Sequence, residues 1–102
     1  MPIKVRLHGR LKDIVGKEEI IIEKDVRTVR ELLEELLKHL GEKAKKEFEV
    51  EKPEDLLQPR SRLVVLIDGF SIKLRGGLDA PLSNVREVNV DNIEVMEWFG
   101  GG

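Results

Sequence analysis

The chain of 102 residues contains no cysteine, so it can form neither a disulfide nor a thiolate metal site. It also lacks any apolar run near the roughly 20 residues that cross a bilayer. Its opening residues, Met1-Pro2-Ile3-Lys4, lack the apolar core of a signal peptide. We therefore expect a cytoplasmic protein that does not enter a membrane.

An excess of one charge is also missing, because 18 basic and 20 acidic residues leave a formal net charge of -2. No overall field would therefore recruit nucleic acid. Charged residues make up 37%, whereas glutamine occurs once and asparagine three times, a bias that resembles thermophile proteins. The length corresponds to a single domain over residues 1–102, with a flexible glycine tail at 100–102.

Ordinary catalytic groups are scarce. His8 and His39 fall on different elements without metal-like spacing, and no serine has a histidine partner nearby in the sequence. No glycine-rich loop leads into a helix, so the phosphate-binding pattern is absent. We expect no metal, no bound cofactor and no catalysis by the domain alone.

The first half of the chain predicts two strands. Residues 3–8 alternate apolar and polar side chains, and residues 18–23 contain three successive isoleucines, which favour a strand over a helix. Residues 9–16 between them predict a short helical turn that Gly16 closes. The two strands are expected to pair antiparallel.

The main helix is predicted over residues 29–40. Thr28 and Glu31 form a capping box before it, and Gly41 is a natural stop after it. One apolar face follows helical spacing and consists of Val29, Leu32, Leu33, Leu36, Leu37 and Leu40. This face is expected to pack against the first strand.

A long charged connection follows at residues 42–61. A connection of this length usually contains structure of its own, so we expect a turn or two of helix over residues 42–48. Its apolar anchors are Phe48, Val50, Leu56 and Leu57, and we expect loose contact through Leu56 and Leu57.

The second half predicts a central strand at 62–68, a turn at Asp68-Gly69 and a short partner strand at 70–74. Residues 75–92 read as a loop, and residues 93–99 as the last strand. If that last strand returns beside the first, the fold is α+β. It would then have a mixed sheet of four to five strands with one main helix across one face.

The ending Phe99-Gly100-Gly101-Gly102 is hard to explain by packing, because glycine adds no side chain and costs the most backbone entropy to order. It suits a thin peptide that carries a carboxylate into a narrow slot; the alternative is a frayed terminus. Leu74-Arg75-Gly76-Gly77 is a similar pattern inside the chain, without a free carboxylate, and reads as a turn.

This order resembles the ubiquitin-like β-grasp fold and, within it, the MoaD- and ThiS-like sulfur carriers. These include the small subunit of molybdopterin synthase and the ubiquitin-related modifier of tRNA thiolation. The resemblance rests on Val5-Arg6-Leu7, Thr28-Val29-Arg30-Glu31-Leu32-Leu33, Leu66-Ile67-Asp68-Gly69, Leu78-Asp79-Ala80-Pro81-Leu82 and the glycine ending. The chain departs from the family in its third glycine, in the long connection at 42–61 and in a final loop lengthened at 84–92.

The resemblance implies that an E1-like adenylating enzyme uses ATP to activate the Gly102 carboxylate, which sulfur then converts to a thiocarboxylate. A side chain at Gly101 or Gly102 would obstruct this approach. In molybdenum cofactor biosynthesis the carrier would insert its tail into the large subunit of molybdopterin synthase. The alternatives are a tRNA-thiolation carrier, a modifier joined to substrate-protein lysines, and a non-covalent β-grasp interaction module.

Strand alternation suggests the surface that partners would grip. If Ile93 and Val95 face the helix, the opposite, open face carries an apolar patch edged by Lys4 and Arg6. The predicted partner-binding residues are Gly100, Phe99, Trp98, Met96, Leu66 and Val64. In the alternative interpretation, the 42–61 connection covers this face and Trp98.

Overall fold

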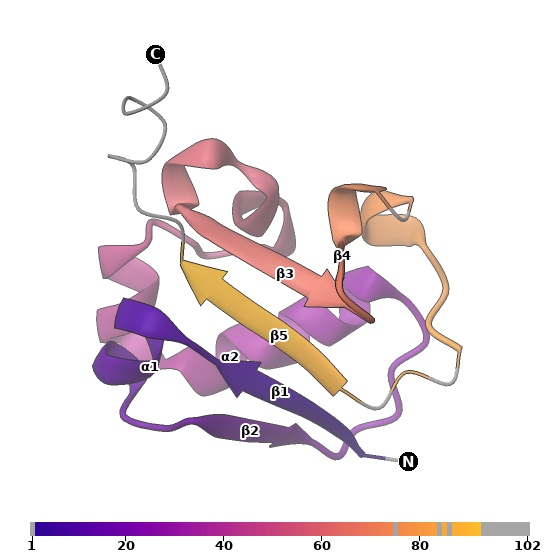
Figure 1. Cartoon of the computed structure of the whole chain (residues 1–102), viewed down its shortest axis with the longest axis horizontal. Coiled ribbons are helices and arrows are strands. Elements are labelled where there is room, and N and C mark those ends of the chain that lie inside the picture. The colour runs from indigo at the N-terminus through magenta and orange to yellow at the C-terminus, as the bar shows by residue number, and fades with distance from the viewer. Residues whose placement is uncertain (1, 75, 84, 86, 93–102) are drawn as a thin grey trace.

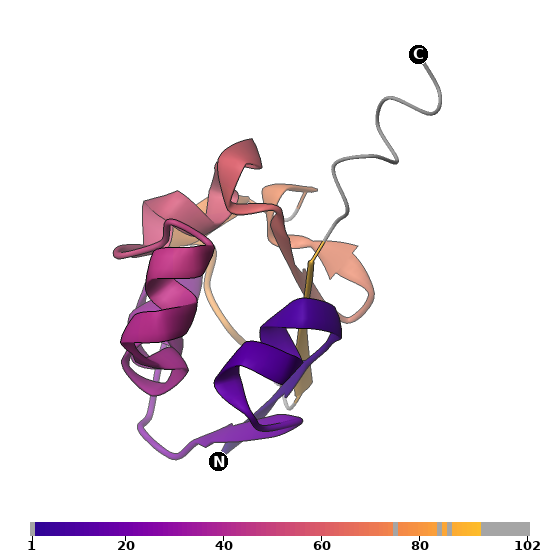
Figure 2. The same ribbon diagram turned by 90° about the vertical axis from the view of Figure 1, so that its left-hand side faces the viewer.

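The computed structural model describes residues 2–74, 76–83, 85 and 87–92. Within them a mixed five-stranded sheet has the order β2-β1-β5-β3-β4, and the main helix packs across one face (Figures 1 and 2). The strands are β1 Ile3–Leu7, β2 Glu19–Ile22, β3 Leu63–Ile67, β4 Phe70–Ser71 and β5 Glu87–Asn92, and the α-helices are α1 Gly9–Val15 and α2 Val29–Glu47. The predicted α+β architecture is confirmed.

The centre of the sheet is formed by strands that are distant in sequence. β1 pairs antiparallel with β2 and parallel with β5, and β5 pairs antiparallel with β3. A strand from the end of the described chain therefore lies beside the first strand, as expected for a mixed sheet.

The position of this last strand was predicted wrongly. Residues 87–92 form β5 rather than part of a loop, so 84–92 is not a simple loop extension. Val88 and Val90 are fully buried, but they alternate with asparagine and aspartate, which are depleted in strands and hide the pattern. Partners on both sides supply the backbone hydrogen bonds. The strand predicted at 93–99 lies outside the described residues.

The main helix begins and breaks where its sequence predicts. The side-chain oxygen of Thr28 accepts the Glu31 backbone N–H at 3.2 Å, and the whole apolar face is buried. At Gly41 the backbone leaves the helical region, with φ 85° and ψ 161°. The chain then resumes a short helical segment that ends at Glu47, in agreement with the helix expected after residue 41.

The long connection is held tightly rather than loosely. Phe48, Val50 and Leu56 are each no more than 1% exposed and belong to the same core as α2. Two short 3₁₀-helices carry the rest, at Pro53–Leu57 and Pro59–Ser61. These are apolar anchors expected from the sequence, but their wide spacing among charged residues did not indicate how deeply they are buried.

Two shorter elements also differ from expectation. α1 is a seven-residue helix rather than a single turn, and Gly16 ends it as predicted with φ 81°. β4 contains only two residues and continues into a 3₁₀-helix, Ile72–Leu74, although the hairpin turn at Asp68-Gly69 is confirmed by their positive φ angles of 53° and 84°. No helix in the described ranges is both long and apolar enough to cross a bilayer.

We expect Gly41→Ala to lower the free energy of unfolding by about 1–3 kcal/mol. Open space surrounds the position, so the cost comes from the positive φ, which residues with a Cβ rarely adopt. Urea unfolding measures it, with the exposed neighbour Glu42→Ala as a control that should change little. Unchanged stability in Gly41→Ala would mean that the helix tolerates continuing through this point.

Asp55 stabilises the connection in a pH-dependent way. Its carboxylate accepts the backbone N–H groups of Glu51 at 2.9 Å and Lys52 at 3.2 Å, and these hydrogen bonds lower the pKa of the carboxyl. A lowered folded-state pKa means that the contribution is complete above the ordinary value near 3.8 and is lost as pH falls.

We therefore expect Asp55→Ala to lose about 0.5–2 kcal/mol of unfolding free energy at pH 7, the usual cost of removing such a cap. Its loss of stability between pH 7 and pH 3 should be smaller than in the wild type. Chemical unfolding at several pH values measures both effects, with the exposed Asp25→Ala as control. A variant that matches the wild type at pH 7 would show that the cap does not matter.

Candidate functional site

The residues predicted to react lie at the end of the chain, outside the described part. This holds for Gly102 and Gly101 and for the neighbouring partner-binding candidates Gly100, Phe99, Trp98 and Met96. Their roles stay predictions. The structure instead describes the point from which they extend, Asn92, and ten residues beyond it span at most about 33–36 Å.

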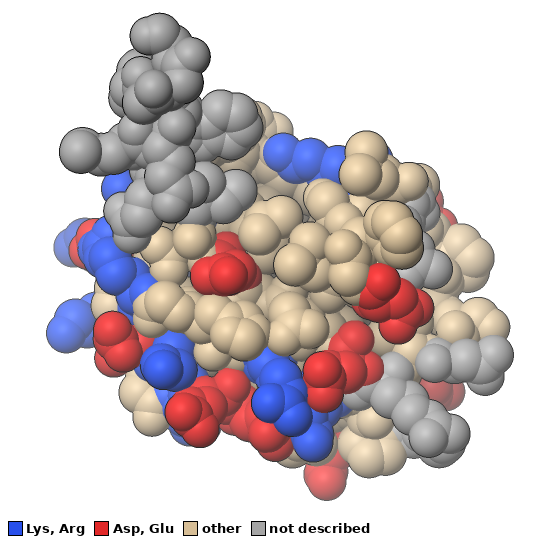
Figure 3. All heavy atoms as spheres, in the orientation of Figure 1, with Lys and Arg blue, Asp and Glu red and all other residues tan. Residues whose placement is uncertain are grey.

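The two other predicted partner-binding residues, Val64 and Leu66, lie on β3 and face away from α2. They are half-buried and alternate with fully core-facing neighbours, so they belong to the open face of the sheet. Figure 3 shows this face, where mostly uncharged surface with one acidic group lies across the middle and charged side chains gather along the lower part. An apolar, partly exposed surface of this kind is suited to contact with another protein.

The same face becomes polar on β1 and β5. Arg6 pairs with Glu87 at 3.1 Å, and both side chains are 47% exposed. His8 Nε2 lies 2.8 Å from Asn89 Oδ1. Exposed ion pairs contribute little to stability, so these charges remain available to a partner. The open face thus combines an apolar half on β3 with a charged half, as expected from the strand alternation.

The long connection lies on the helix side of the sheet rather than over Val64 and Leu66 (Figure 2). Arg30 of α2 donates to Glu54 of the connection at 2.7 Å and to Asp79 at 3.5 Å. The contact with Glu54 raises the pKa of Arg30 and lowers that of Glu54. Within the described chain, the interpretation that this connection covers the open face is therefore wrong.

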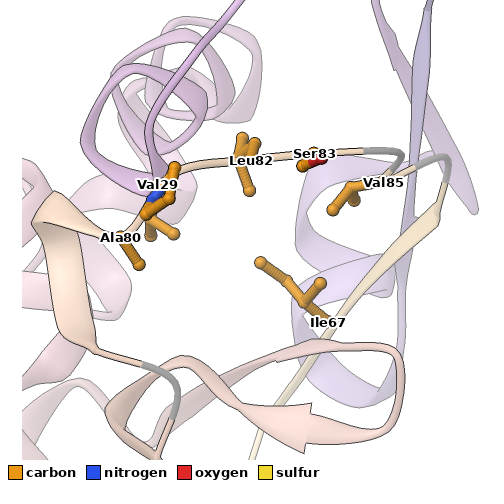
Figure 4. A pocket seen from close by; sticks show the side chains of 7 residues that line it. Val29, Ile67, Ala80, Leu82, Ser83 and Val85 are labelled. Carbon is orange, nitrogen blue, oxygen red and sulfur yellow. The ribbon is translucent and has the colours of Figure 1, made fainter.

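An apolar cavity of about 250 Å³ lies between residues 80–85 and the core (Figure 4). Its loop is tied to the start of α2, because Val29 donates its N–H to Ala80 and Leu82 donates to Arg27. The lining side chains are Val29, Ile67, Ala80, Pro81, Leu82, Ser83 and Val85. None of them titrates near neutral pH, so this cavity offers no acid–base chemistry.

Two other features considered in the sequence are the internal glycine pair and possible metal ligands. Gly76 and Gly77 adopt positive φ angles of 98° and 72° beside short 3₁₀-helices, as expected for a turn. β5 follows them, so a cut there would remove a central strand. Among the described residues, no group of three or more histidine, aspartate or glutamate side chains could hold a metal.

The sequence reasoning missed a set of contacts at the end of β5. Asn92 Oδ1 accepts the backbone N–H of Arg10 at 2.8 Å, and Asp91 Oδ1 accepts the backbone N–H of Asn92 at 2.8 Å. Gly9 lies against the same Asn92 oxygen. The signal in the sequence is the pair Asp91-Asn92, which can hold the end of a strand through side-chain hydrogen bonds. It is informative only once residues 87–92 are recognised as a strand.

Comparison with known proteins supplies the family. A family model described as the ThiS family matches residues 5–102. No significant match was found among curated proteins.

Three solved structures share the fold at low sequence identity. SAMP1 from Haloferax volcanii has a TM-score of 0.66 at 17% identity, covering 93% of this chain and 98% of that one. A protein from Pyrococcus furiosus assigned as molybdopterin converting factor, subunit 1, has 0.63 at 21%, covering 92% and 99%. The small archaeal modifier protein SAMP1 from Methanosarcina acetivorans has 0.63 at 18%, covering 92% and 94%.

These likenesses agree with the mixed sheet, the single main helix across it and the parallel pairing of the first and last described strands. The family model covers nearly the whole chain and extends through its last residue. The chain therefore belongs to the ThiS family and has the ubiquitin-like β-grasp fold.

Proposed function

We propose that this chain is a sulfur carrier whose C-terminal Gly102 is activated by an E1-like adenylating enzyme. The observation that carries the proposal is the match of the ThiS family model through the final glycine, on a chain that ends Gly100-Gly101-Gly102. A bare terminus attached to a folded body is suited to entering another protein's active site.

The chemistry belongs to the terminal carboxylate. One of its oxygens attacks the α-phosphate of the partner's ATP, and pyrophosphate leaves. A hydrosulfide-level sulfur donor then attacks the acyl carbon, the C–S bond forms and AMP leaves with the C–O bond electrons. The product at Gly102 is a thiocarboxylate, whose sulfur is a better nucleophile than a carboxylate oxygen. Gly101 and Gly102 permit this because they have no Cβ to obstruct the reacting atoms.

The folded body would dock through its open face. Val64 and Leu66 provide apolar contact, and Arg6, Glu87 and Lys4 provide a charged margin. This division is typical of interfaces in which an apolar centre is surrounded by polar groups. We propose the same face for the adenylating enzyme and for a large synthase subunit, because both would need the tail to point into their sites.

The pathway that we favour is molybdenum cofactor biosynthesis, with this chain as the small subunit of molybdopterin synthase. The shared fold with the Pyrococcus furiosus protein supports this choice.

The second candidate is a protein modifier, in which a substrate lysine attacks activated Gly102 to form an isopeptide bond. The shared fold with two archaeal modifier proteins favours it. Both functions use the same activation step, so the fold by itself serves either.

Mass spectrometry of the protein from its native cells tests the choice. A sulfur carrier should show a C-terminus in which sulfur replaces one oxygen, and it should co-purify with a large synthase subunit. Gly-Gly remnants on lysines of other proteins would instead support the modifier. A terminus that stays unmodified in cells making the cofactor would contradict both and leave a non-covalent module.

We expect deletion of Gly101 and Gly102 to abolish activation while leaving thermal stability nearly unchanged. The reason is that the reacting carboxylate would move back by two residues, whereas glycines at a terminus bury no side chain. ATP–pyrophosphate exchange with the adenylating enzyme and a thermal unfolding scan measure the two properties. Persistent exchange, or a large loss of stability, would contradict a purely chemical role for the tail.

We expect Leu66→Asp to raise the KM of the adenylating enzyme for this chain by about tenfold or more, the effect typical of an apolar interface anchor. The side chain is half-buried, so the variant should still fold. Ile21→Asp is a matched control, because Ile21 is 43% exposed and lies on β2, at the far edge of the same sheet. Equal effects of the two substitutions would argue against a docking site centred on β3.

A further inference from the structure

The pairing of β5 with β1 ends at a defined residue. Leu7 is opposite Val90, and His8 donates its backbone N–H to the Val90 carbonyl at 3.0 Å. At Gly9 the chain turns away into α1 with φ +61°. β1 therefore offers no further strand residue to the end of β5, although Asn92 still lies opposite Leu63 of β3.

Two side chains at the end of β5 accept hydrogen bonds beyond the last residue of β1. Asp91 Oδ1 accepts the backbone N–H of Asn92 at 2.8 Å, and Asn92 Oδ1 accepts the backbone N–H of Arg10 at 2.8 Å. Both distances are typical of well-formed hydrogen bonds. The Asn92 contact attaches the end of β5 to the start of α1, whereas the Asp91 contact joins two neighbouring residues of β5.

Gly9 lies close to the Asn92 side chain. A Cβ at this position would overlap Asn92 Oδ1 and lie 3.1 Å from its Cγ, with Asp91 Oδ1 3.5 Å away. The positive φ also disfavours any other residue. A residue with a Cβ at position 9 would therefore displace the Asn92 side chain and strain the backbone.

The other side of the contact is held by α2. The Arg10 guanidinium is 2.5 Å from a carboxylate oxygen of Glu47, and it lies over the Phe48 ring with 5.6 Å to the centroid. Phe48 is 1% exposed and belongs to the core. Asn92 therefore binds the backbone N–H of a residue, Arg10, whose side chain contacts the core.

We propose that Asn92 is a positioning residue, which fixes the end of β5 against α1 and with it the place from which the chain continues toward Gly102. The inference rests on the proposed function, because it needs the terminal carboxylate to react elsewhere. A fixed end of β5 limits where Gly102 can lie relative to the docked open face.

This role predicts a specific kinetic pattern. Asn92→Ala removes the acceptor and should lower the kcat of ATP–pyrophosphate exchange about three- to tenfold, the range expected for losing one hydrogen bond. KM should stay unchanged, because docking uses Val64 and Leu66. Asn92→Asp keeps an acceptor oxygen and should restore most of the rate. Titrating the adenylating enzyme with each variant separates kcat from KM.

A second set of variants tests the contact itself. Gly9→Ala alone should lower the thermal unfolding midpoint because of the clash, and adding Asn92→Ala should recover part of it. The double variant should nevertheless keep the low kcat, because the Arg10 N–H still has no Asn92 acceptor. Strictly additive losses of stability would contradict the close approach of these two residues.

The outcomes separate this inference from the proposed function. If the wild type is activated and Asn92→Ala has the same kcat, the positioning role is wrong and the sulfur-carrier proposal stands. If Asn92→Ala loses stability but not kcat, the residue is structural only. If the wild type supports no exchange and no thiocarboxylate forms in its native cells, both proposals fail.

Discussion

The placement of β5 between β1 and β3 is the constraint on which the rest of this structure depends. Val88 and Val90 are fully buried there, and the strand has backbone partners on both sides. A strand in this position cannot leave without opening the middle of the sheet. The end of β5 is therefore a firm base for the C-terminal segment that carries Gly102, where we propose that the chemistry takes place.

The helix and the connection leave one face of the sheet open. α2 buries its leucines on one side, and the charged connection adds Phe48, Val50 and Leu56 to the same core. Long insertions commonly cover sheets, yet this one is tied to α2 by the Arg30–Glu54 contact. Among the described residues, this division leaves the apolar half of the open face partly exposed on β3, beside β5, where we propose that partners dock.

The elements with strong apolar spacing or clear turn residues could be predicted from the sequence. The α2 face, the alternation of the first strand, the Asp68-Gly69 hairpin and the break at Gly41 each have a local cause, so the sequence predicts them. β5 was not predicted, because its polar residues are poor strand formers and it pairs with strands that are distant in sequence. The apolar anchors of the connection could be identified from the sequence, but their tight burial could not, because they are sparse and pack against distant parts of the chain.

What the sequence by itself determined is the elements with strong local spacing and capping, above all α2, since these need no distant partner. It also led to the expectation that the chemistry lies at the glycine ending. Only the tertiary structure decided which segment fills the centre of the sheet and which face remains open. It also brought Gly9 and Asn92 together across more than 80 positions of chain. The physical reason is that backbone ladders and close contacts of this kind form between residues that no local pattern relates.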